Sequence, residues 1–192
     1  MLGLTIIVAA TKSNGIGKNS GLPWRLAKEM KYFAQVTTNA PEGYANAVVM
    51  GRNTWESIPK MFRPLPRRVN IVISGNNKYE VYVVPDLTEI NDAIIHSEIR
   101  GRSIYAEALD LSATSNSLAV VDRVLLTRIV SPDFDDCDVF MPDFLKDDES
   151  TSNKWERASH SDLEEWVGFK VPQGVQKEDG VEYEFQMWTR PT

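Results

Sequence analysis

The sequence is poor in the residues that build disulfide-linked or metal-bound folds. It has one cysteine, Cys137, and two histidines among 192 residues. One cysteine cannot form an internal disulfide, so a disulfide scaffold is excluded. His96 and His160 have no cysteine or histidine at metal-ligand spacing, and we therefore expect no metal site. Acidic neighbours of Cys137 oppose a thiolate, which disfavours a nucleophilic cysteine.

Long hydrophobic runs are also missing. Leu2–Ala10 is apolar, but it has about half the length of a membrane span, and no basic segment precedes it. Its β-branched residues predict a buried strand instead. The net charge is −6, and an acidic chain is poorly suited to general nucleic-acid binding. We therefore expect neither a membrane nor a nucleic-acid partner.

The charge is unevenly distributed along the chain. Residues 1–78 contain 11 basic and 3 acidic residues, whereas residues 79–192 contain 10 basic and 24 acidic ones. The first part could receive an anionic ligand although the whole chain is acidic. A chance division of a solvated surface accounts for the same numbers equally well.

The best-known nucleotide and hydrolase motifs are absent. Asn14-Gly15-Ile16-Gly17 is a bare G-x-G, and the chain has no G-x-G-x-x-G, no Walker loop and no G-x-S-x-G. A Rossmann domain, a P-loop and an α/β-hydrolase elbow are therefore not supported.

Strand and helix patterns alternate along most of the chain, which predicts an α/β fold with a mixed sheet. Strands are expected at 5–10, 47–50, 69–73, 80–84 and 120–129, with antiparallel strands at 155–159 and 183–187. Helices are expected after Pro23, from a capping box formed by Asn53 and Glu56, after Asp86, and at 103–111. Asp179-Gly180 predicts a turn before the last strand.

The helix after Pro23 carries an acid on its apolar side. On a helical wheel, Glu29 falls between Val36 and Phe33. Met30 lies on the same side. A buried carboxylate without a partner is costly, and its pKa rises. We therefore expect Glu29 to meet a ligand, a proton or a cation, with backbone donors or water at the edge of the core as the alternative.

Two other segments suit anions. Gly51-Arg52-Asn53-Thr54 follows a buried strand and opens a helix, a geometry that directs free N–H groups at an anion. An ordinary strand-to-helix turn is an equally good interpretation. The basic segment 63–68 could clamp a carboxylate, although a solvated loop explains it more simply.

In this order, several segments resemble dihydrofolate reductase, most closely the fungal type. The matching segments are 7–10, 15–17, 22–25, 49–59, 63–65, 125–129, 161–164 and 183–185. They cover nearly the whole chain, and their combination is far more specific than any one of them. The resemblance implies one domain over residues 1–192 with an adenosine-binding subdomain at roughly 45–105. It also implies a central, mostly parallel eight-stranded sheet, flanked by about four helices, with an antiparallel C-terminal strand.

The resemblance further implies NADPH-dependent reduction of 7,8-dihydrofolate to tetrahydrofolate, which feeds one-carbon metabolism. Glu29 would bind the pterin and assist its protonation through a water that Trp24 positions, and Thr127 would support the carboxylate. The substrate would also be contacted by Ile7, Val8, Met30, Phe33, Ile58, Leu65 and Arg68. The cofactor would be contacted by Ala9, Ile16, Gly17, Leu22, Gly51, Arg52, Asn53, Thr54, Ser74, Gly101, Ser103 and Tyr105.

Several finer expectations come with this resemblance. Arg68 would hold the α-carboxylate of the glutamyl tail, with Arg67 at the surface, and the loop at 14–22 would close over the nicotinamide. Dihydrofolate and antifolates would be the ligands of a monomer. The expected location is cytoplasmic, in agreement with the single cysteine, with mitochondrial or nuclear location as alternatives.

The resemblance is interrupted beside the cofactor. Arg100 stands where the family usually has the first of two glycines, which allow close approach of the backbone. The segment between Ser74 and Tyr105 is also short by more than a strand. Gly75 replaces an arginine that often binds the 2′-phosphate, so the preference for NADPH is inherited from the family. A catalytically impaired binder of folates or antifolates is one alternative. A related pyrimidine reductase of riboflavin synthesis is another, which Glu29 disfavours.

Overall fold

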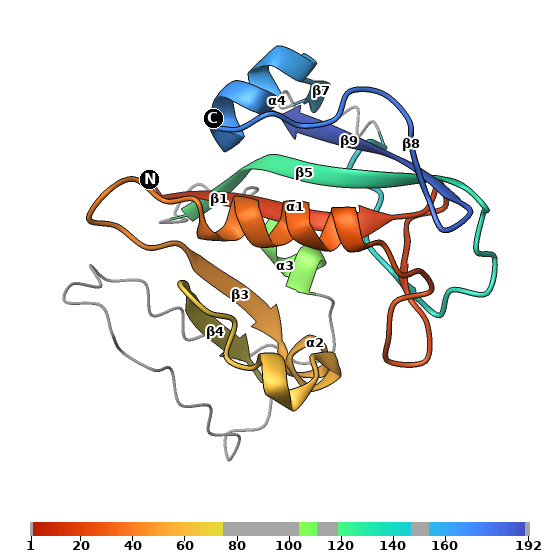
Figure 1. Ribbon diagram of the computed structural model, residues 1–192, viewed down its shortest axis with the longest axis horizontal. Coiled ribbons are helices and arrows are strands. Elements are labelled where there is room, and N and C mark those ends of the chain that lie inside the picture. The colour runs from red at the N-terminus through yellow and green to blue at the C-terminus, as the bar shows by residue number, and fades with distance from the viewer. Residues whose placement is uncertain (1, 75–103, 111–118, 147–153, 191–192) are drawn as a thin grey trace. The chain divides into compact units, whose positions relative to one another are not determined.

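The computed structural model describes residues 2–74, 104–110, 119–146 and 154–190 (Figure 1). The chain divides into two units, Met1–Lys31 with Tyr105–Thr192, and Tyr32–Ile104, and each is described by itself. The strand expected at 80–84, the helix after Asp86 and the interruption around Arg100 lie outside the described residues. The single domain with an adenosine-binding subdomain stays a prediction.

The first unit is built on a five-stranded mixed sheet (Figure 1). β1 (Leu2–Ala10) pairs in parallel with β5 (Ala119–Ser131), and β5 pairs antiparallel with β9 (Val181–Thr189). Two short strands, β7 (Glu156–Arg157) and β8 (Gln176–Glu178), pair antiparallel with β9. This arrangement confirms the mixed sheet and its antiparallel C-terminal strand.

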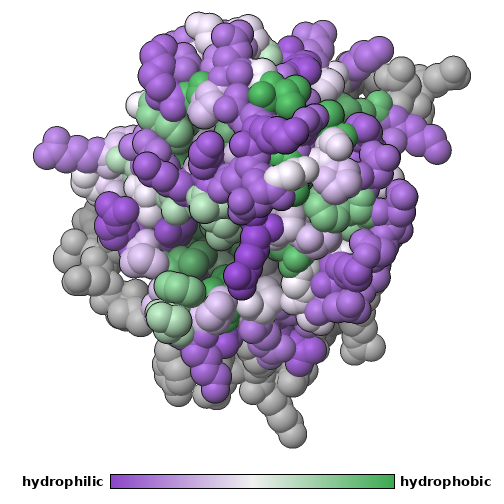
Figure 2. All heavy atoms as spheres, turned by 45° about the vertical axis from the view of Figure 1, so that its right-hand side comes forward, coloured by the Kyte–Doolittle hydropathy of each residue, from purple (hydrophilic) through white to green (hydrophobic). Residues whose placement is uncertain are grey.

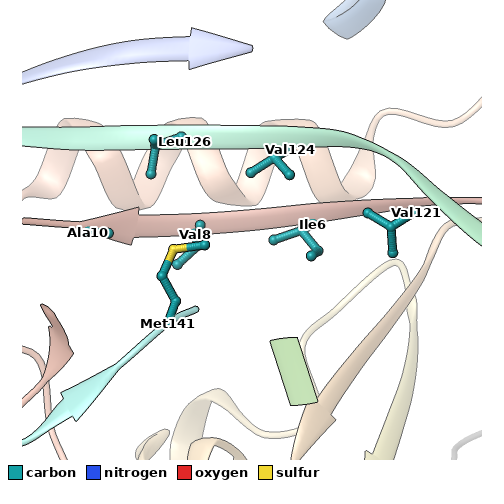
Figure 3. Close-up of a cluster of buried hydrophobic side chains, with 7 residues drawn as sticks. All are labelled: Ile6, Val8, Ala10, Val121, Val124, Leu126 and Met141. Atoms are coloured by element: carbon teal, nitrogen blue, oxygen red, sulfur yellow. The ribbon is translucent and has the colours of Figure 1, made fainter. Parts of the chain in front are cut away.

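Side chains of β1 and β5 alternate between the two faces of this sheet. One face carries a buried hydrophobic cluster, shown in Figure 3, of Ile6, Val8, Ala10, Val121, Val124, Leu126 and Met141. Each buried side chain of leucine size contributes roughly 2 kcal/mol to folding. The register pairs Ile7 with Leu125 and Ala9 with Thr127, so these four residues share the opposite face.

Four further elements lie wholly or mostly in the first unit. β2 (Gly15–Gly17) pairs antiparallel with β6 (Val139–Phe140). α3 (Ile104–Asp110) corresponds to the helix expected at 103–111, and its first residue is the last residue of the second unit. α4 (His160–Val167) begins with a capping box, in which Ser159 and Asp162 exchange hydrogen bonds with each other's backbone N–H. It ends at Gly168 in the left-handed conformation, with φ 75°.

The second unit contains a parallel pair of strands. β3 (Ala47–Gly51) pairs with β4 (Val69–Ile73), as their β-branched runs predict, and α2 (Arg52–Ser57) and η1 (Lys60–Phe62) connect them. The expected capping box of Asn53 and Glu56 is wrong. The strand runs into the helix without a break, so Gly51 is the N-cap and Asn53 already lies in the first turn.

The helix expected after Pro23 is α1 (Ala27–Thr38), which begins four residues after the proline and crosses the boundary of the two units. Glu29 is buried, as the wheel predicts, with 6% of its surface exposed. Met30 is 49% exposed, so its placement on the buried side is wrong. Tyr32 and Val36 are buried, and they shift the buried arc away from Met30.

On the face shown in Figure 2, hydrophilic side chains predominate and hydrophobic ones appear in small groups. None of the described helices combines the length and the apolar character that crossing a membrane requires.

Candidate active site

Glu29 lies in the first turn of α1, against the centre of the first unit's sheet. Thr127 on β5 donates its hydroxyl to Oε1 of Glu29 at 3.4 Å. Burial raises the pKa of Glu29 to about 7; the hydrogen bond from Thr127 opposes this rise and the negative charge of Glu178 adds to it. A carboxyl group with this pKa can hold or release a proton near neutrality.

Trp24 lies in the segment that leads into α1. Its side chain is 4% exposed and packs edge-on against Phe134, with 5.3 Å between ring centroids. Its indole Nε1 is buried and has no hydrogen-bond partner among the described residues. Since a buried N–H is costly unless it is satisfied, this atom fits a site for a ligand or an ordered water. Phe134 was missed in the sequence, where nothing connects it with Trp24.

β1 contributes two of the expected site residues to the same face as Glu29. The register sets Ala9 beside Thr127 and Ile7 beside Leu125. Val8 is different, because its side chain belongs to the buried cluster on the opposite face (Figure 3). Val8 can therefore contact a ligand on the Glu29 face through its backbone only, because its side chain lies on the other face.

Backbone hydrogen bonds connect the loop after β1 to β6 and to Asp138, the residue just before β6. The N–H of Gly15 donates to the Thr11 hydroxyl at 2.9 Å. The N–H of Asp138 donates to the carbonyl of Gly17 at 3.0 Å, and the Asp138 carboxylate accepts the N–H of Asn19 at 2.9 Å. These bonds hold the backbone of the expected cofactor loop in a defined position.

Side chains of this loop point in different directions. Lys18 forms an ion pair with Asp136. Ile16 packs against the buried cluster, and Leu22 is 54% exposed. Of the expected cofactor residues in this loop, Leu22 thus presents the most apolar surface.

Replacing Gly15 by alanine tests this attachment. A Cβ at this position would lie 2.6 Å from Sγ of Cys137. We expect Gly15→Ala to lower the free energy of unfolding by about 2 kcal/mol through overpacking, measured by chemical denaturation. Gly21→Ala is the matched control, because its Cβ would approach no atom closer than 3.7 Å. Equal stability of the two variants would contradict the packing described here.

In the second unit, the expected phosphate-binding residues lie at the carboxyl ends of two parallel strands. Gly51 ends β3 opposite Ile73 of β4, and Ser74 follows directly. Gly51 is the N-cap residue of α2, and in the described part of the chain no side chain forms a capping hydrogen bond there. Exposed side chains of its first turn come from Arg52, Asn53 and Thr54. In open parallel sheets this edge is where ligands bind.

Arg68 is held by its own unit. Its guanidinium donates to the Pro66 carbonyl at 3.0 Å and to the Thr37 hydroxyl. Burial lowers the pKa of Arg68, and the charge of Arg67 adds to this effect. Arg67 is exposed, which confirms its expected place at the surface.

Asn70 shapes the loop before β4 and was missed in the sequence. Its side-chain amide exchanges two 2.9 Å hydrogen bonds with the backbone of Leu65 and also donates to the Arg68 carbonyl at 3.0 Å. It is buried on β4, where a lone asparagine in an apolar run is its one sequence signal. Leu65 is half-buried, as are Ile58 and Phe33.

The remaining expected cofactor residues are Gly101, Ser103 and Tyr105. Gly101 and Ser103 lie outside the described residues. Tyr105 on α3 packs against the buried cluster, and burial raises the pKa of its hydroxyl to about 12. Across the described ranges, no group of three or more His, Cys, Asp or Glu residues could hold a metal ion.

The fold and these two sites define a class of protein. The chain is an α/β enzyme with a buried carboxyl group, Glu29, whose pKa burial raises to about 7, and, in its second unit, a strand edge suited to phosphate. The family model described as dihydrofolate reductase matches residues 3–171, and the chain belongs to this family.

Named relatives agree with this assignment. The chain is 41% identical to dihydrofolate reductase from Pneumocystis carinii over 211 residues, covering 97% of this chain and 96% of the relative. It is 39% identical to the enzyme from Cryptococcus neoformans, covering 96% and 93%. The alignment with the Pneumocystis enzyme is longer than this chain, so that relative has residues without a counterpart here.

The fold is also similar to a solved structure. Dihydrofolate reductase from Schistosoma mansoni superposes with a TM-score of 0.67 at 32% identity, covering 99% of each chain. Family and relatives make this chain an oxidoreductase that reduces dihydrofolate to tetrahydrofolate with a nicotinamide cofactor. Neither the impaired binder nor the pyrimidine reductase is favoured.

Proposed function

We propose that the chain transfers a hydride from NADPH to C6 of 7,8-dihydrofolate while N5 gains a proton, with Glu29 as the carboxyl group that binds the pterin. The observation that carries this proposal is a buried carboxyl group with a pKa of about 7, supported by Thr127. When bound, the nicotinamide supplies the hydride.

Glu29 has two tasks in this reaction. As a carboxylate, its two oxygens can accept N–H bonds from the 2-amino group and N3 of the pterin, which orients the ring. Near neutrality, a large fraction of Glu29 is protonated, so it can also supply a proton through a water. The unpartnered Nε1 of Trp24 is a donor that can hold this water.

The substrate's other contacts follow the resemblance. We assign the pterin and its apolar extension to Ile7, Met30, Phe33, Ile58 and Leu65, and the α-carboxylate of the glutamyl tail to Arg68. Arg68 suits this task because the Pro66 carbonyl and Thr37 hold its guanidinium. The backbone of Val8 is the one part of that residue that we include.

The described residues fit the cofactor. Gly17 ends β2, and a Cβ there would lie in van der Waals contact with the Gly21 carbonyl oxygen and Val139, at 3.4 Å. The N-terminus of α2 offers N–H groups to phosphate, and Arg52 adds positive charge. We assign the cofactor to Ala9, Ile16, Gly17, Leu22, Gly51, Arg52, Asn53, Thr54 and Ser74, with Tyr105, Gly101 and Ser103 as further contacts.

The rest of the proposal is inherited from the family. We propose a monomer in the cytoplasm, with mitochondrial or nuclear location as alternatives, and with antifolates as inhibitors. Neither a membrane nor a nucleic acid is part of its function.

One assay tests the proposed reaction. We expect oxidation of NADPH that depends on dihydrofolate and is blocked by an antifolate, with slower oxidation of NADH. Binding of the antifolate without turnover would instead identify an impaired homologue. Equal rates with NADH and NADPH would contradict the assignment of the phosphate-binding residues.

A further inference from the structure

The first turn of α1 is held by a residue far away in the sequence. Oε1 of Glu178 on β8 accepts the N–H of Ala27 at 2.8 Å, and Oε2 accepts the N–H of Lys28 at 3.1 Å. The first N–H groups of a helix have no partner within it, and a carboxylate at this end also interacts favourably with the helix dipole. Glu178 thus caps the helix that carries Glu29, from a position about 150 residues away.

Glu178 is itself held in place. The hydroxyl of Tyr183 donates to its Oε2 at 3.2 Å, and the Tyr183 side chain is 0% exposed. Both residues belong to the β8–β9 hairpin, whose turn at Asp179-Gly180 has positive φ at both residues. The carboxylate is therefore connected to the sheet on one side and to α1 on the other.

Glu178 is the acidic residue whose charge changes the pKa of Glu29. Its charge raises the pKa of Glu29, in addition to the larger effect of burial. Other charged groups nearby are engaged or exposed. Lys28 and Lys31 of α1 are exposed, and Arg128 on β5 donates to the Thr11 carbonyl and to Asn14.

Further titratable groups stand on the hairpin, among them Lys177, Glu182 and Tyr183. Lys177 pairs with Glu182 at 3.3 Å. Burial and Glu178 raise the pKa of Tyr183 to about 12, so the hydroxyl keeps its proton and remains a donor. Glu178 therefore brings a negative charge to Glu29 that no cation on the hairpin or on α1 is seen to pair with in the described residues.

We propose that Glu178 is a positioning residue for the reaction: it anchors the first turn of α1 and sets a fixed negative charge beside Glu29. This inference rests on the proposed role of Glu29. The anchor keeps the Glu29 carboxyl group directed at the pterin. The negative charge of Glu178 keeps a larger fraction of the Glu29 carboxyl group protonated at neutral pH than burial alone would.

The test is the pH dependence of hydride transfer in single turnovers. Glu178→Gln keeps an oxygen that can accept an N–H but removes the charge. We expect the pH at which the rate declines, near 7 in the unchanged protein, to move to lower pH. A change of half a pH unit lowers the rate about threefold on the alkaline side. Glu182→Gln, in the same hairpin, is the matched control and leaves the profile in place.

The outcomes separate this inference from the proposed function. If Glu29→Gln keeps the rate and profile of the unchanged protein, the proposed role of Glu29 fails, and this inference with it. If Glu29→Gln abolishes the pH dependence but Glu178→Gln does not shift it, only this inference fails. A decline of equal size at every pH would indicate a merely structural role and would also overturn it.

A second variant covers the case in which Glu178→Gln does not fold. Glu178→Asp keeps the charge on a shorter side chain that cannot reach both N–H groups. We expect it to keep the pH of the decline while kcat falls about threefold, with little change in KM, because the anchor is weakened. A profile shifted to lower pH, or kinetics identical to those of the unchanged protein, would overturn the proposal.

Discussion

Replacing Glu29 by glutamine is expected to slow hydride transfer at neutral pH by about 100-fold or more, the range of general acid catalysis. The amide keeps the size of the side chain and one acceptor for the pterin, but it has no proton to supply. Trp24 and Thr127 remain in place, so binding of the substrate should weaken less than the rate falls. Single-turnover measurements with saturating dihydrofolate separate these two effects.

The control for this variant is Glu165→Gln, an exposed acid on α4. It should leave the rate unchanged. Circular dichroism and thermal unfolding show whether Glu29→Gln is folded. A folded Glu29→Gln protein with near-normal turnover would contradict the role assigned to this residue.

The stability of the protein should fall as the pH rises from about 4.5 to about 7. Glu29 has a pKa of about 7 in the folded protein, against an ordinary value of 4.5. Between these values, the folded chain binds more protons than the unfolded chain, so the free energy of unfolding decreases as the pH rises. The stabilising contribution of protonated Glu29 is therefore complete below pH 4.5 and is lost as the pH passes 7. The contribution of Glu29 to this change is about 3 kcal/mol as an upper bound.

Chemical denaturation at pH 5 and pH 8 measures this effect. The unchanged protein should lose about 2.5 kcal/mol more than Glu29→Gln between the two pH values, because glutamine does not titrate. Other groups contribute equally to both proteins and cancel in the comparison. Parallel curves for the two proteins would show that Glu29 titrates at its ordinary pKa.

Local patterns were sufficient to predict much of the fold. The β-branched runs of β1, β3, β4 and β5 form strands, and the alternation of Tyr183, Phe185 and Met187 places these side chains in the core. Glu29 was located on a buried helix face because a helix has one dominant period. These features depend on neighbours a few residues apart, which a sequence displays directly.

Features that depend on distant residues were missed. α1 begins at Ala27 because Glu178 caps it, and no local motif announces a cap some 150 residues away. Phe134 packs on Trp24, and Asn70 shapes the loop of Leu65, through contacts that exist only in the folded chain. The face on which the Val8 side chain lies was also not predicted, because it is set by how β1 packs in the folded sheet.

The roles of the site residues came from the resemblance, whereas the chemistry of Glu29 came from its position. Both lead to the same residue, which strengthens the case for it. The assignments of Gly101 and Ser103, and the short segment around Arg100, lie outside the described residues and stay predictions.

The position of β9 has a consequence for synthesis of the protein. β5 lies between β1 and β9, and β9 brings the buried side chains of Tyr183, Phe185 and Met187 into the sheet. A ribosome completes β5 at Ser131 and reaches the start of β9 at Val181 about 50 residues later, at roughly 5 to 20 residues per second. The growing chain thus exposes one edge of β5 for several seconds, and a premature stop codon before Val181 would leave it exposed for good. Such a product should aggregate or be degraded rather than persist as a partly active enzyme.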